Sequence, residues 1–164
     1  MSQLSKKMPF RRRVLVPLAA MVMTASIGSH ALAQACLVEE EITSLHLEAL
    51  RTELMVAALS CGTEIHYNAF IDRFRAPLIS GDVTLAGLFQ RLYGPATGSD
   101  HRDGFTTGLA NRVSAQQSAQ RVEFCNRADK IFTAAEEVST GGIGPFAEKY
   151  SRLDRAKIQA CSAG

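Results

Sequence analysis

The sequence predicts an all-α protein: a single-domain bundle of five or six short helices, stapled by disulfides. Apolar residues recur at three- and four-residue spacing over most of the chain after residue 35, as they do on the inner face of a helix. No window of four or more residues alternates apolar and polar side chains with β-branched enrichment, so we expect no sheet. Apolar stripes of this kind are buried by packing the helices against one another.

Residues 1–35 have the pattern of a cleaved secretory signal peptide. Five basic residues lie among the first thirteen, an apolar stretch follows at Val14–Gly28, and small-x-small cleavage sites end at Ala33 and Ala35. The apolar stretch is shorter than the roughly 18 to 20 residues that a spanning helix needs. We therefore expect cleavage, a periplasmic or secreted location, and no integral membrane segment afterwards.

Removal of the signal peptide reverses the net charge. All sixteen acidic residues follow Ala35, whereas five of the eighteen lysines and arginines precede it, so thirteen basic residues face sixteen acidic ones and the net charge is −3. A mildly acidic chain with interspersed charges lacks the basic stripe that binds phosphates, which argues against nucleic acid as a partner. Residues 36–164 are long enough for one helical domain with its own core.

The first expected helix runs from about Glu39 to Ser60. Its first turn carries three glutamates, which the helix dipole favours, and Gly62 stands where a left-handed residue ends a helix. The apolar run from Leu54 to Leu59 is six residues long and is flanked by charges, so it predicts a central core helix and not a membrane span.

Two further helices are expected before residue 94. One starts at Thr63 as N-cap and is kinked or ended by Pro77. Ser80-Gly81-Asp82 then predicts a break, followed by a short helix at Val83–Tyr93 that Gly94-Pro95 closes.

The sequence of the second half of the domain predicts three more helical elements. Residues 96–104 form a loop that leads into a helix with Phe105 on its apolar face, and the polar stretch 114–120 indicates a bend. A fifth helix carries apolar residues from Phe124 to Val138 and stops at Gly141-Gly142, and a last element spans about 145–158.

Four cysteines in an exported chain imply two disulfides, with three possible pairings. Cys36 and Cys61 bracket a helix of over 30 Å, whereas a disulfide needs Cα atoms within about 7 Å, which disfavours that pair. Two pairings stay open, and we prefer Cys61–Cys125 with Cys36–Cys161, because the second bond ties the chain ends together. A hairpin at residues 141–142 would instead bring Cys125 close to Cys161.

Other patterns give no specific catalytic or cofactor motif. A reactive Cys61 thiol is disfavoured because a helix C-terminus raises the pKa of a thiol, and Cys-x-x-Cys is absent. His46, His66 and His101 lack the spacing of a metal site in a bundle, so we expect no metal and no cofactor.

The segment EIHYNAFIDRFR offers a possible partner or ligand groove, in which Tyr67, Asn68 and Arg73 form a polar lip beside Phe70 and Phe74. The alternative is an ordinary amphipathic helix with its arginines in solvent. The pattern favours this alternative, because any bundle helix shows it.

The segments LRTELMVAALSCG, YNAFIDRFRAPL and GFTTGLANRVS, followed by Phe124-Cys125, resemble in this order a family of uncharacterised small secreted helical proteins of Gram-negative bacteria. The resemblance implies a periplasmic helical fold with Cys61 and Cys125 as family features, and it brings no catalytic residues. We expect a non-enzymatic interaction protein, an adaptor or chaperone-like factor whose partner is another envelope protein. The alternative is a small-molecule or metal-binding helical bundle.

Overall fold

The computed structural model describes residues 36–161, and the predicted signal peptide at residues 1–35 lies outside this range. The described chain is an all-α bundle, as predicted, and its only β-type pairing is an isolated bridge between Leu37 and Ala160. Its six α-helices are α2 (Glu39–Cys61), α3 (Glu64–Arg73), α4 (Arg75–Tyr93), α5 (Gly98–Ala119), α6 (Arg121–Glu136) and α7 (Ile143–Tyr150), with short 3₁₀ turns η1 (Thr140–Gly142) and η2 (Arg155–Lys157).

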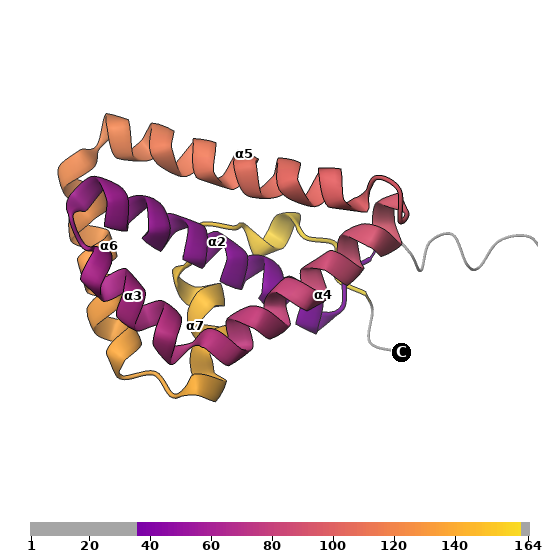
Figure 1. Ribbon diagram of the computed structural model, residues 1–164, viewed down its shortest axis with the longest axis horizontal. Helices are drawn as coiled ribbons and strands as arrows, with labels where there is room; N and C mark the ends of the chain where they lie inside the picture. Colours follow the sequence, from indigo (N-terminus) through magenta and orange to yellow (C-terminus); the bar gives the residue numbers. More distant parts are fainter. Residues whose placement is uncertain (1–35, 162–164) are drawn as a thin grey trace, which may run out of the picture.

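Helix α2 is the centre of the bundle. It lies between α5 and α3 in the view of Figure 1, and all five other α-helices contact it. The prediction of its bounds is confirmed to within one residue. Gly62 ends the helix in the left-handed conformation with φ 75°, and its N–H donates to the carbonyl of Ala58.

The chain between α3 and α4 turns at Phe74 and not at the predicted sites. The predictions that Pro77 kinks or ends a helix and that residues 80–82 break the chain are wrong, because α4 runs unbroken from Arg75 to Tyr93. Pro77 is the third residue of α4, where a helix has no internal partner for the N–H that proline lacks. Phe74 is completely buried and holds the corner in place.

Helix α5 is longer than expected. It begins at Gly98, within the predicted loop, so that prediction is wrong. It continues to Ala119, so the bend predicted for residues 114–120 is confined to Gln120, between α5 and α6. Few of its side chains are buried, so the apolar stripe by which a helix is recognised covers only a short part of its sequence. Gly98 lies so close to α4 that a Cβ there would sit 2.9 Å from the backbone of Gln90, which explains the glycine.

Helices α6 and α7 complete the bundle. Helix α6 buries its predicted apolar stripe, whereas α7 ends at Tyr150, well before the predicted end near residue 158. The chain after α7 runs back to the start of α2, where the N–H of Leu37 donates to Gln159 and that of Cys161 donates to Leu37. The two ends of the domain thus lie side by side.

The apolar interior has two parts along α2. A larger cluster joins the C-terminal half of α2 to α3, α6 and α7, with Phe74, Phe132 and Phe146 among its members. A smaller one joins Leu45 to the C-terminal half of α4. In the described residues, no helix combines the length and the apolar character needed to cross a bilayer.

Candidate functional site

Helices α3 and α6 enclose an apolar pocket of about 170 Å³. Its base consists of aromatic rings that also belong to the core, and its lining includes two small side chains, the exposed Ala69 and the buried Ala135. We refer to it as the α3–α6 pocket. The residues that line it are His66, Ala69, Phe70, Arg73, Phe74, Phe132, Ala135 and Glu136.

Charged and polar side chains surround the entrance of the α3–α6 pocket. The Arg73 guanidinium donates to the carbonyl of Val138 from Nη2 at 2.9 Å and from Nε at 3.3 Å. It thereby supplies a hydrogen-bond donor to a backbone carbonyl just after α6 and fixes that end of the helix to α3. His66 lies against Phe132 with ring centroids 5.9 Å apart, and Glu136 contributes a carboxylate.

Only part of the predicted groove belongs to this pocket. Phe70, Arg73 and Phe74 line it, but Tyr67 and Asn68 do not. Tyr67 is half-buried and packs on the main core near Arg51, and burial raises the pKa of its phenol, partly offset by the Arg51 cation. Asn68 is exposed.

The residues that sequence reasoning missed come mainly from α6. Phe132, Ala135 and Glu136 are about sixty residues from α3 in the chain, and nothing in the periodicity of either helix indicates which partner it meets. His66 could have been included, because it lies four residues before Phe70 and so on the same face of the helix.

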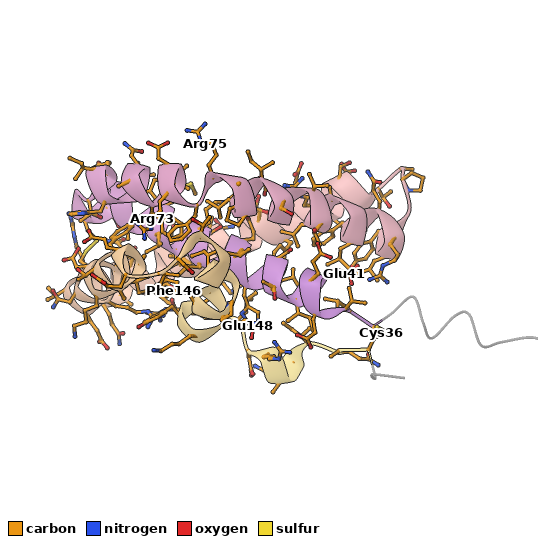
Figure 2. All side chains as sticks on the ribbon, turned by 90° about the horizontal axis from the view of Figure 1, so that it is seen from below. Cys36, Glu41, Arg73, Arg75, Phe146 and Glu148 are labelled. Atoms are coloured by element: carbon orange, nitrogen blue, oxygen red, sulfur yellow. A yellow bond between two sulfur atoms is a disulfide. The ribbon has the colours of Figure 1, made fainter. Side chains whose placement is uncertain are left out.

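The four cysteines form two disulfides, Cys61–Cys125 and Cys36–Cys161, with Cα–Cα distances of 5.7 and 4.9 Å. This is the pairing that the sequence analysis preferred. The first bond fixes the end of α2 to the first turns of α6, and the second joins Cys36, which precedes α2 and is labelled in Figure 2, to Cys161 at the other end of the described domain. Cys61 therefore carries no thiol that could act as a nucleophile. Two disulfides are typical of an oxidising compartment outside the cytoplasm.

The three histidines considered as metal ligands lie apart. His46 is buried in α2, His66 flanks the α3–α6 pocket, and His101 stacks on Tyr93 at 3.8 Å between centroids. Within residues 36–161, no three side chains of the metal-binding types form a group that could hold an ion.

His46 makes one unexpected contact, in which its Nδ1 lies 2.7 Å from the hydroxyl of Ser151. Its Nε2 is buried and has no hydrogen-bond partner in the described chain, so no carboxylate orients the ring as in a catalytic triad. Burial lowers the pKa of His46, an effect that Glu148 opposes and Arg155 reinforces. Burial of the ring therefore favours the neutral form of the His46 imidazole.

Helix α2 also buries charges that the sequence analysis did not single out. Glu48 accepts from Arg51 at 2.5 Å, and Arg51 also contacts Asp82 at 3.1 Å. Burial raises the pKa of the Glu48 carboxyl, an effect that Arg51 opposes. Further along the helix, Glu53 pairs with Arg127 and Arg152. These pairs satisfy charges that would otherwise be costly inside the bundle.

No family model, curated protein or solved structure matches this chain.

Proposed function

We propose that this chain is a non-enzymatic periplasmic interaction protein, which holds one apolar side chain of another envelope protein in the α3–α6 pocket. The observation that carries the proposal is the pocket itself, an open apolar hollow with an aromatic base and a charged rim. Protein interfaces concentrate their binding energy in pockets of this kind, with an anchor side chain at the centre and polar residues around it.

The size of the pocket supports an anchor of one side chain. An engineered cavity of about 150 Å³ holds a benzene molecule. At about 170 Å³, the α3–α6 pocket suits a phenylalanine or leucine side chain. The rim offers both an arginine and a glutamate, so it complements a polar segment of either sign around the anchor.

The apolar surface continues beyond the pocket along α3. Ile65 is 76% exposed and lies four residues before Ala69, on the same face of the helix. A partner helix that places one side chain in the pocket would place another, three or four residues away, against Ile65. The proposed periplasmic location is supported by the signal-peptide pattern and by the disulfides.

A photo-crosslinking experiment in cells tests this proposal. A benzoylphenylalanine at position 65 is expected to form one dominant adduct with an envelope protein, which mass spectrometry would identify. Ala69→Trp fills the entrance of the pocket and is expected to abolish the adduct. The matched control, Ala76→Trp, places the same ring on an exposed position of α4, outside the pocket, and is expected to leave the adduct unchanged.

The proposal is wrong if the adduct is absent or if both tryptophan variants behave alike. A folding control accompanies each variant, in which mass under non-reducing conditions reports the two disulfides and circular dichroism reports helix content.

A further inference from the structure

A second, smaller pocket of about 110 Å³ lies between α2, α5 and the chain after α7. Its walls combine apolar side chains from the two helices with a buried carboxylate and two guanidinium groups. We refer to it as the α2–α5 pocket. The residues that line it include Glu53, Leu109, Arg112, Val113 and Arg152.

Glu53 lines this pocket, and one of its two carboxylate oxygens has no hydrogen-bond donor among the described residues. Only 1% of the residue is exposed. Its Oε1 accepts from Nε of Arg127 at 2.9 Å and from Nε of Arg152 at 3.2 Å. Its Oε2 is also buried and accepts no hydrogen bond from any described residue. A buried charged oxygen without a donor is energetically costly, so this side of Glu53 favours a ligand that brings an O–H or N–H group.

The charges around the pocket favour an anion. Glu53 is already paired with two arginines, and Arg112 adds a third guanidinium that makes no ion pair or hydrogen bond with any described residue. Arg152 uses Nε for Glu53, and its terminal nitrogens donate to no group in residues 36–161. Both guanidinium groups can therefore hold a carboxylate, for which their planar, forked geometry is suited.

We propose that the α2–α5 pocket binds a small 2-hydroxy carboxylate. The hydroxyl donates to Oε2 of Glu53, the carboxylate binds Arg112 and Arg152, and the short carbon chain packs against Leu109 and Val113. The pocket is smaller than the cavity of about 150 Å³ that holds benzene, whose ring has about six non-hydrogen atoms, so it suits a ligand no larger than that. A 2-amino acid offers a similar donor, but its ammonium group adds a positive charge where arginines are already in excess.

This site is separate from the α3–α6 pocket and shares no lining residue with it. Its test therefore does not depend on the proposed partner.

The proposal is tested by ¹H–¹⁵N NMR titrations of the disulfide-bonded domain with four probes. L-lactate is expected to give saturable shifts of the amides near Glu53, Leu109 and Val113. Propionate lacks the hydroxyl and is expected to bind at least about tenfold more weakly, as for the loss of a hydrogen bond to a charged group. Propane-1,2-diol lacks the carboxylate and is expected not to bind, and L-alanine is expected to bind more weakly than lactate.

Two variants assign the contacts. Arg112→Gln removes an exposed, unpaired guanidinium and is expected to weaken lactate binding at least about fivefold, as for the loss of a charge-assisted hydrogen bond. Glu53→Gln is expected to abolish the preference for lactate over propionate; if that variant does not fold, Arg112→Gln and the probe series still decide. Arg75→Gln is the matched control, because Arg75 points away from the bundle on α4 (Figure 2), and it is expected to change nothing.

The proposal is overturned if lactate gives no saturable shifts, if lactate and propionate bind equally, or if alanine binds more tightly than lactate. Unchanged lactate binding in the Arg112→Gln variant would also overturn it.

Discussion

The α3–α6 pocket and the α2–α5 pocket lie on different sides of the central helix α2, and their linings differ in chemical character. The first has a base of phenylalanine rings and keeps its charges at the rim, whereas the second has a carboxylate in its wall and two guanidinium groups around it. The first therefore depends on apolar packing and the second on charge pairing. The two proposals therefore place an apolar anchor and a polar ligand at sites that share no lining residue.

The largest expected effect comes from the base of the α3–α6 pocket. Phe74→Ala removes a ring that is completely buried and also fixes the corner between α3 and α4, so the free energy of unfolding should fall by about 3 to 5 kcal/mol. Ile79→Ala, on an exposed part of α4, is the control and should change it by no more than about 0.5 kcal/mol. Urea denaturation measures both. If the two variants lost the same free energy of unfolding, the aromatic base of the pocket would not be part of the packing that stabilises the fold.

A smaller effect is expected at the α2–α5 pocket. Glu53→Gln leaves Arg127 and Arg152 without their carboxylate, but the side chains of these arginines are 34% and 40% exposed and stay partly hydrated. We expect a loss of about 1 to 3 kcal/mol in the free energy of unfolding.

Glu136→Gln makes the same change at the exposed rim of the α3–α6 pocket and should be neutral to within about 0.5 kcal/mol. If urea denaturation gave the two variants the same stability, the charge pairing around Glu53 would not stabilise the fold.

His46, which belongs to neither pocket, should make the stability of the domain depend on pH. Because burial lowers the pKa of His46 in the folded state below its ordinary value of 6.5, the unfolded chain binds the proton more readily. The contribution of His46 to stability is therefore fully present above pH 6.5 and is lost as the pH falls from there towards the folded pKa.

His46→Gln should remove this part of the acid sensitivity, whereas Ser151→Ala keeps the imidazole and should retain it. Denaturation curves recorded at neutral pH and at successively lower pH values measure the slope. A slope that is the same in the wild type and in His46→Gln would contradict the assignment.

The smallest effect is expected at the Arg75–Asp72 ion pair. The N–O distance is 2.7 Å, but both side chains are more than two-thirds exposed, so the pair should contribute no more than about 0.5 kcal/mol. Arg75→Gln should leave the free energy of unfolding and both pockets essentially unchanged. A larger loss in urea denaturation would mean that the corner at Phe74 depends on this pair as well as on apolar burial.

Much of the fold could be predicted because local signals agree with the packing. The glutamates and Gly62 mark both ends of α2, and the stripe that starts at Phe124 marks the buried face of α6. The failures have different causes: Pro77 lies in the first turn of α4, where proline is tolerated, and the polar end of α5 is exposed and shows no apolar stripe. Gly81 lies beside Leu47 of α2 inside a continuous helix, where even an added Cβ would make only ordinary van der Waals contact at 3.6 Å.

The candidate sites could be predicted only in part. Three residues of the predicted groove line the α3–α6 pocket because they share one face of α3, but the opposite wall comes from α6, and helical periodicity does not specify which helices meet. Glu53 was missed for a different reason: a glutamate in an amphipathic helix is expected in solvent. Its burial follows from α2 being covered on several sides, which only the assembled bundle shows.

The most direct test of the central claim, that the α3–α6 pocket receives an apolar side chain, is an NMR titration of the ¹⁵N-labelled domain with N-acetyl-L-phenylalaninamide. The account predicts saturable shifts of the amides of Ala69, Phe132 and Ala135, loss of these shifts in Ala69→Trp, and no change near Glu53. An absence of saturable shifts, or shifts centred on the α2–α5 pocket, would contradict it.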